Sequence, residues 1–211
     1  MNKSKKSNKK LIYIFISVLS FVLFTFVVKS HALDQFDFNT TVKIQDHVPR
    51  KFDTLFSIFS LIGSFEVLVL VLLVLIFLRK KLKGAVVIVI FLLTHFVEIF
   101  GKTFLHHPGP PFLFFRYDLP IFFPSSYVQP GSSYPSGHSF RSIFIATLII
   151  FTVIKSKKIE DFKKIVLIVV TSLIAGLILF SRISLGEHWT TDVVGGALLG
   201  LASSYLALLF F

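Results

Sequence analysis

Residues 180–192 of this chain read Phe180-Ser-Arg-Ile-Ser-Leu-Gly-Glu-His-Trp-Thr-Thr-Asp192, a polar stretch between two long apolar runs. A charged side chain at the centre of a bilayer costs roughly 3 kcal/mol even on lenient insertion scales, so we expect this stretch at a membrane surface. His188 and Asp192 are four residues apart and would share one helix face, where the carboxylate can hold one ring nitrogen and leave the other free to react. Arg182 adds a planar fork of donors that suits phosphate oxygens. The stretch therefore predicts a phosphoryl-transfer site with a histidine nucleophile.

The composition on either side of this stretch is that of an integral membrane protein. Of the 211 residues, 54% are hydrophobic and only 16% are charged, where soluble domains have about a quarter charged. The absence of cysteine excludes disulfides, thiolate catalysis and cysteine metal sites. The net charge is +11, but 14 of the 22 Lys and Arg residues fall in three short blocks, at 3–10, 79–83 and 155–164. Basic blocks that flank apolar runs indicate cytoplasmic loops, so we expect no nucleic-acid partner.

Six apolar runs are long enough, or nearly so, to cross a bilayer, which takes about 20 helical residues. They cover residues 11–28, 54–78, 84–105, 139–154, 164–181 and 191–211. We therefore predict an all-α fold, a six-span transmembrane helical bundle. The three basic blocks all agree with cytoplasmic N- and C-termini. The first run could instead be a signal peptide cleaved near Ser30-His-Ala32, but its length favours an uncleaved anchor.

The chain divides into two predicted parts. Residues 1–53 would form a basic cytoplasmic N-terminus, the first anchor and an external segment, and residues 54–211 a five-helix catalytic domain. Within the second part, 106–135 is predicted to be an external loop, because seven of the eight prolines fall at 108–135 and proline breaks helices. The loop is rich in phenylalanine, which would either anchor it in the interface or contact lipid tails.

Alternating spans place three polar clusters on the external side. The first cluster ends the third span and contains His95, Glu98 and Lys102, whose spacings of three and four put them on one helix face. The second is the stretch from Tyr134 to Arg141, and the third is the stretch that ends at Asp192. Their convergence is the strongest indication from spacing that they form one site.

The clusters contain what is needed to hold a phosphoryl group. Lys102, Arg182 and Arg141 would supply positive charge, and Ser136 would supply a neutral donor. Gly137 has no Cβ, so the backbone can approach the phosphate closely where a helix begins and its N–H groups point at an anion.

The reaction expected from these residues has two steps. His188 would attack phosphorus to give a phosphohistidine, with Asp192 fixing its tautomer. His138 would donate a proton to the leaving oxygen and then activate water. Glu98 would pair with Lys102 and support the site.

Ser-Arg-x5-His-x3-Asp at 181–192 and Pro-Ser-Gly-His at 135–138 resemble the type 2 phosphatidic acid phosphatase (PAP2) superfamily over about residues 53–211. The resemblance implies a PAP2-like core and a metal-independent phosphatase without a cofactor. It also implies the nucleophile at His188, the acid/base at His138, and phosphate ligands at Lys102, Ser136, Gly137 and Arg182.

One position departs from the family pattern. The first family motif is Lys, six residues, Arg, Pro, but here Lys102 is followed at that spacing by Gly109 and Pro110. Loss of the arginine removes a bidentate phosphate contact. Arg141 or Arg116 could replace it. His106 and His107 lie within the motif and could contact phosphate or be solvated, and the latter reading is preferred.

We therefore expect a multi-pass plasma-membrane phosphatase with an external active site and a lipid phosphate as substrate. Undecaprenyl or another polyprenyl diphosphate is the first candidate, followed by phosphatidic acid and phosphatidylglycerol phosphate. A lipid-phosphate binding or transport module without turnover is the alternative, and a lipid phosphotransferase is a third. We predict no metal site, because no His-Glu-x-x-His pattern is present.

Overall fold

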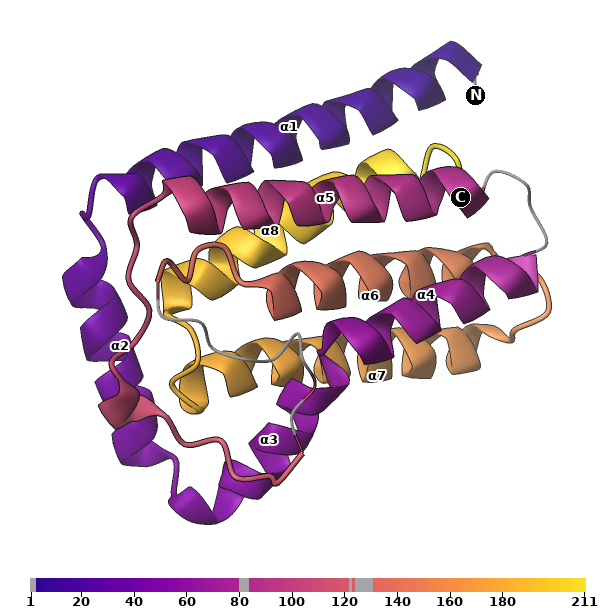
Figure 1. Ribbon diagram of the computed structural model, residues 1–211. Helices are drawn as coiled ribbons and strands as arrows, with labels where there is room; N and C mark the ends of the chain where they lie inside the picture. Colours follow the sequence, from indigo (N-terminus) through magenta and orange to yellow (C-terminus); the bar gives the residue numbers. More distant parts are fainter. Residues whose placement is uncertain (1–2, 80–83, 122, 124–130) are drawn as a thin grey trace.

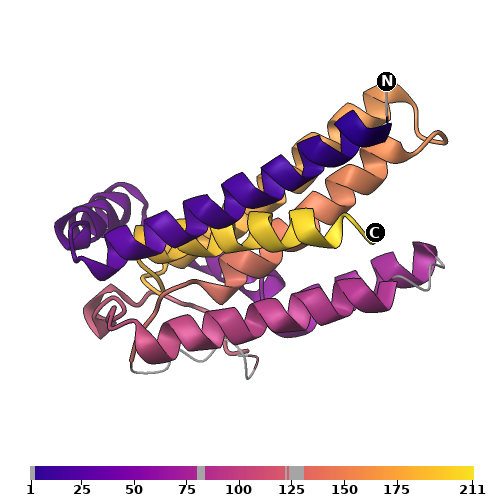
Figure 2. The same ribbon diagram turned by 90° about the horizontal axis from the view of Figure 1, so that it is seen from above.

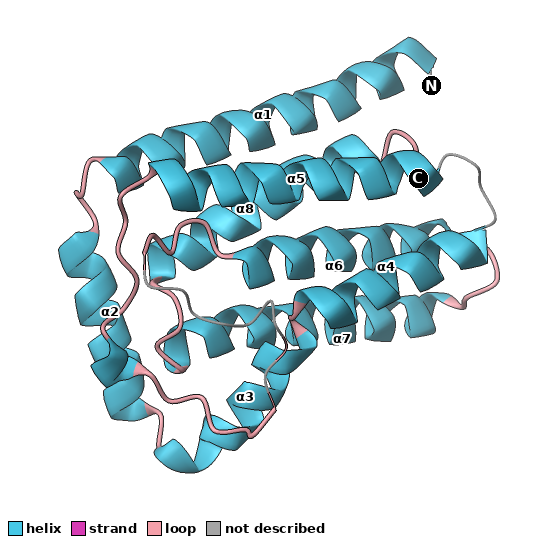
Figure 3. Ribbon diagram, in the orientation of Figure 1, coloured by secondary structure: helices cyan, strands magenta, loops and turns pink. Residues whose placement is uncertain are grey.

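The computed structural model describes residues 3–79, 84–121, 123 and 131–211, and in these ranges every regular element is helical (Figures 1 and 3). Residues 80–83, which hold most of the second basic block, and Phe122 of the aromatic loop lie outside the described residues. The helices are α1 (Lys3–Lys29), α2 (Asp34–His47), α3 (Asp53–Ile62), α4 (Phe65–Arg79), α5 (Gly84–Phe104), α6 (Gly137–Lys155), α7 (Asp161–Ser184) and α8 (Thr190–Ala207). Two short 3-10 turns, η1 (Arg50–Phe52) and η2 (Phe112–Phe114), complete the set.

Four of the described helices, α1, α5, α6 and α7, are long and apolar enough to cross a membrane. The turn η1 with α3, together with α4, gives a fifth span if the bent pair crosses as one. The predicted sixth span, 191–211, corresponds to α8, which is not among them, so the count of six stays a prediction.

The predicted single span 54–78 is broken at Gly63 and Ser64, where α3 and α4 meet at 49°. A side chain at position 63 would overlap Ile178 of α7 and lie 3.1 Å from the His138 ring, so only glycine allows this approach. Ser64 is fully buried, and its hydroxyl accepts from the Val67 amide at 3.5 Å, which helps begin α4.

The predicted external segment after α1 is not simply a loop. The chain reverses at His31, which has a φ of 59°, and then forms α2. Asp34 and Asp37 lie in the first turn of α2, where their negative charge stabilises the positive end of the helix dipole. α2 packs against α7 and α8, so residues 1–53 are packed onto the remainder of the bundle.

Helices α6 and α8 form the centre of the bundle and pack closely because α8 carries small residues. A side chain at Gly196 or Gly200 would overlap the α6 backbone at Ser136 or Phe140. This is the close packing expected from small residues four apart. α8 also contacts α1 and α5, as Figure 2 shows from above.

Tyr134, the first residue of the second polar cluster, is fully buried in the structure. Its hydroxyl lies 2.8 Å from Thr25 Oγ1 of α1. The contact joins α1 to the segment that leads into α6.

The bundle has two different ends. The ends of α5 and α7 and the beginnings of α6 and α8 gather at one end, next to α2, on the left of Figure 1. The chain termini and the connection between α6 and α7 lie at the other end. The three polar clusters therefore share one end, and the side of the membrane that it faces stays a prediction.

Candidate active site

His188 stands in the short connection between α7 and α8, and Asp192 in the first turn of α8 holds it. His188 Nδ1 lies 3.2 Å from Asp192 Oδ2, which also accepts from the Trp189 amide at 2.9 Å. Asp192 is fully buried. Because a carboxylate only accepts, Nδ1 carries the proton and the Nε2 lone pair is available for attack on phosphorus.

The surroundings of His188 favour its neutral form. Burial lowers the pKa of its imidazole well below the usual value, and the positive charges of Arg182 and Lys102 act in the same direction. A neutral ring is the form that a nucleophile requires.

His138 lies in the first turn of α6 and is 3% exposed. Arg141 Nη2 is 3.3 Å from its Nδ1. A guanidinium only donates, so Nδ1 accepts here and the neutral ring carries its proton on Nε2. Nε2 is buried and has no hydrogen-bond partner among the described residues. Arg182, Arg141, His188 and Lys102 all lie close enough to act electrostatically on His138.

Glu98 of α5 organises the cations on one side of the site. Its carboxylate accepts from Lys102 Nζ at 2.8 Å, the pairing that the spacing of four predicted. It also lies 3.5 Å from Arg141 Nη1 and 3.0 Å from His95 Nδ1. The His95 ring packs edge-on against the Phe140 ring, so it both fills space and contacts Glu98.

Arg182 has two partners that sequence reasoning did not assign to it. Its Nη1 contacts the carboxylate of Glu187 and the hydroxyl of Ser60. Ser60, on α3, also donates to Glu187 at 3.0 Å. Glu187 is only 3% exposed, and burial raises the pKa of its carboxyl. Both contacts are made by Nη1, whereas Nε of Arg182 is buried without a hydrogen-bond partner among the described residues and can donate to a phosphate oxygen.

Ser136 and Gly137 begin α6 beside these charged groups. Ser136 caps the helix, with its Oγ accepting from the Ser139 amide at 3.4 Å, and its own amide donates to the Asp192 carbonyl at 3.0 Å. This second contact joins the start of α6, next to His138, to the first turn of α8, which carries Asp192. The first turn of α6 presents its N–H groups in an orientation that suits an anion.

A profile of the PAP2 superfamily matches residues 67–211, more than half of the chain. The chain belongs to the PAP2 superfamily. Together with its apolar helices, membership makes it a multi-pass membrane protein.

Phosphatidylglycerophosphatase B of Bacillus subtilis (strain 168) is 28% identical over 130 residues, which are 62% of this chain. The match spans 59% of that relative, less than two thirds of its length. A crystal structure of a transmembrane PAP2-type phosphatidylglycerolphosphate phosphatase from Bacillus subtilis superposes with a TM-score of 0.74, covering 94% of this chain and 95% of the other at 21% identity. The Aquifex aeolicus LpxE structure gives a TM-score of 0.60 and 29% identity, covering 82% of this chain and 94% of LpxE.

Two arginines, Arg116 and Arg141, could replace the one that the PAP2 motif has at the position of Gly109. Arg116 is engaged elsewhere: it pairs with Asp53 at 2.9 Å and donates to the carbonyls of Gln45 and Val48. Arg141 lies instead beside Glu98 and His138, and its Nε has no hydrogen-bond partner among the described residues. Of the two, Arg141 is the one that lies among the candidate site residues.

The prediction that His107 is solvated is wrong, because the residue is only 5% exposed. Its Nε2 lies 3.4 Å from Asp192 Oδ1 and 3.3 Å from Thr191 Oγ1. Asp37 of α2 accepts from both the Thr191 amide, at 2.9 Å, and the Thr191 hydroxyl, at 2.5 Å. This network places α2 and the loop after α5 behind Asp192, and no local spacing in the sequence indicates it. The neighbouring His106 is exposed.

We expect Gly137→Ala to lower both the stability and any activity of the protein. The added methyl group would overlap Glu98 Oε1 and lie 2.8 Å from Arg141 Nη1, and overpacking of this kind costs about 1–3 kcal/mol. The melting temperature measured in detergent should fall. Gly176→Ala on α7 is the control, because its methyl group would meet nothing within 4 Å. Equal melting temperatures for the two variants would contradict the close contact at Gly137.

Proposed function

We propose that the protein is a membrane phosphatase that removes the terminal phosphate from a lipid phosphate, with His188 as nucleophile. One observation carries the proposal: His138 and His188 share the field of the same three cations, Lys102, Arg141 and Arg182. Such a group of charges is suited to an anion that bridges the two rings.

In the first half-reaction, Nε2 of His188 attacks phosphorus while the bond from phosphorus to the lipid oxygen breaks. Asp192 Oδ2, 3.2 Å from Nδ1, stabilises the positive charge that develops on the ring. When the phosphate anion binds and draws Arg141 away, His138 takes up a second proton, on Nδ1, from solvent; it then transfers its Nε2 proton to the leaving oxygen. The products are the lipid alcohol and a phosphohistidine.

In the second half-reaction, His138 Nε2 takes a proton from water, and the water oxygen attacks phosphorus. The bond from phosphorus to His188 breaks and inorganic phosphate leaves. Throughout the cycle, Nδ1 of His138 carries a proton, so Arg141 cannot continue to donate to it. The phosphate offers Arg141 an acceptor instead, which would place the guanidinium where the missing motif arginine is expected.

The names of the relatives support phosphatidylglycerol phosphate as the first substrate to test. Phosphatidylglycerophosphatase B aligns with 62% of this chain. Polyprenyl diphosphate, the first candidate from the sequence, stays a prediction and belongs in the same comparison.

The test is phosphate release by the detergent-purified protein from phosphatidylglycerol phosphate, phosphatidic acid and undecaprenyl diphosphate, each with a chelator present. We expect release from at least one lipid. If the protein binds all three lipids but releases no phosphate, it is a binding or transport module and not a phosphatase. The presence of Gly109 in place of the motif arginine favours this alternative. Transfer of phosphate to an added alcohol in preference to water would indicate a phosphotransferase.

The acid limb of the pH–rate profile provides a further prediction. The nucleophile must be neutral, and because the pKa of His188 is lowered, acidification protonates it only well below the usual value of about 6.5. We therefore expect no loss of kcat/KM centred at about pH 6.5 from this group. Buffers from pH 4 to 8, with protein stability followed in parallel, would measure the profile. A loss centred at about pH 6.5 that moves to higher pH when the charge of Lys102 is removed would identify the titrating group as His188 and contradict its lowered pKa.

A further inference from the structure

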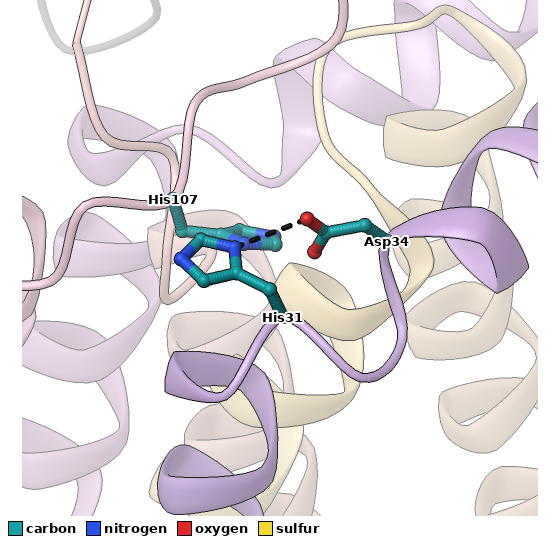
Figure 4. A group of neighbouring side chains, drawn as sticks. All are labelled: His31, Asp34 and His107. Atoms are coloured by element: carbon teal, nitrogen blue, oxygen red, sulfur yellow. Dashed lines mark hydrogen bonds and ion pairs between the residues drawn. The ribbon is translucent and has the colours of Figure 1, made fainter.

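A second group of side chains with metal-binding chemistry lies outside the catalytic pair. His31 stands in the reversal between α1 and α2, Asp34 in the first turn of α2, and His107 in the loop after α5 (Figure 4). One ligand atom from each, a ring nitrogen or a carboxylate oxygen, lies within 4.8 Å of the other two. His31 Nδ1 and Asp34 Oδ2 are 3.0 Å apart.

The ligand types and spacing fit a transition-metal dication. Two imidazoles and one carboxylate form a set that zinc commonly accepts, with bonds of about 2.0–2.2 Å, so tetrahedral ligand atoms stand about 3.4 Å apart. The ligand atoms here lie within 4.8 Å of one another, so the longest separation needs to close by at most about 1.4 Å to reach that value. His31 and Asp34 are about half exposed and can turn to do so, and a water can take the fourth position.

Buried negative charge behind the cluster favours a cation. His107 Nε2 lies 3.8 Å from Asp37 Oδ2 and 3.4 Å from Asp192 Oδ1. Both carboxylates are at most 2% exposed, so their charges are poorly screened. The cluster therefore consists of two exposed side chains, His31 and Asp34, and one buried side chain, His107, which lies next to two carboxylates.

We infer that His31, Asp34 and His107 bind a zinc-like dication, and that the bound ion lowers turnover at the neighbouring catalytic site. The effect on turnover rests on the proposed phosphatase function, whereas the binding does not. An ion bound to either ring nitrogen of His107 adds positive charge next to Asp192. That charge weakens the stabilisation by Asp192 of the positive charge that develops on the His188 ring.

The binding test uses the full chain, purified without a polyhistidine tag and titrated with Co²⁺. We expect one equivalent of cobalt with the visible absorption of a four- or five-coordinate nitrogen–oxygen site, displaced by Zn²⁺. His31→Ala and Asp34→Asn each remove a ligand and should weaken binding at least about tenfold, the smallest loss typical when a group behind a ligand is removed. Both positions are exposed, so these variants should fold.

His47→Ala is the matched control. His47 is exposed at the opposite end of α2, about 20 Å from Asp34 along the helix. Its removal should leave cobalt binding unchanged. No stoichiometric binding, or binding that survives in both His31→Ala and Asp34→Asn, would overturn the inference.

The coupling test measures phosphate release with and without Zn²⁺, each variant relative to its own metal-free rate. We expect saturating Zn²⁺ to lower the rate about tenfold, reversibly with a chelator, in the unaltered protein and in His47→Ala but not in His31→Ala. Cobalt binding without any phosphatase activity would leave the metal site standing and remove the proposed function. Equal inhibition of His31→Ala and His47→Ala would overturn the coupling.

Discussion

Replacing His188 with alanine should lower phosphate release by at least about 10⁴-fold, the scale seen when a covalent nucleophile is removed. The reason is the local geometry: the buried carboxylate of Asp192 holds Nδ1 of His188 and leaves its Nε2 lone pair for the attack, in the field of Arg182 and Lys102. His138 cannot substitute for it, because its Nδ1 faces Arg141 and no carboxylate among the described residues contacts its ring.

The rate should be measured in detergent with the lipid that the unaltered protein hydrolyses best, and the melting temperature should be recorded alongside it. Rapid quenching with labelled substrate should trap an acid-labile phosphoprotein in the unaltered protein and none in His188→Ala. His106→Ala, at an exposed position, is the control. A folded His188→Ala protein that retains activity within about tenfold would exclude the phosphohistidine mechanism.

The parts of the site that sequence predicts are those set by helical spacing. His188 with Asp192, and Glu98 with Lys102, are each four residues apart, and both pairs are in contact in the structure. The helical periodicity fixes these contacts before any packing is known. Alternation of spans likewise brings the polar clusters to one end of the bundle.

The parts that sequence does not predict depend on packing between distant segments. Ser60 reaches Arg182 across 122 positions, and Thr191 reaches Asp37 across 154. The break at Gly63 follows from the closeness of α7, which no apolar run reveals. No pattern within one helix predicts that His31 and His107 are neighbours, for the same reason: their two segments meet only in the folded chain.

Asp192→Asn is the second substitution with a large expected effect, a loss of about 10³–10⁴-fold in kcat. The amide keeps the shape of the side chain but can donate to His188 Nδ1, which would leave the ring proton on Nε2, the atom that must attack. It also removes the negative charge that stabilises the ring as the P–N bond forms. Asp46→Asn, at an exposed position on α2, is the matched control and should retain full activity.

A substrate with an activated leaving group distinguishes the role of Asp192 from that of His138. The leaving oxygen of p-nitrophenyl phosphate needs no proton, so this substrate should restore the formation of phosphoenzyme in His138→Ala. It should not do so in Asp192→Asn, because there the attack itself is impaired. Rescue of both variants to the same extent would mean that Asp192 does not position the nucleophile. Rescue of neither, in folded protein, would mean that His138 contributes to binding the phosphate and not to protonating the leaving group.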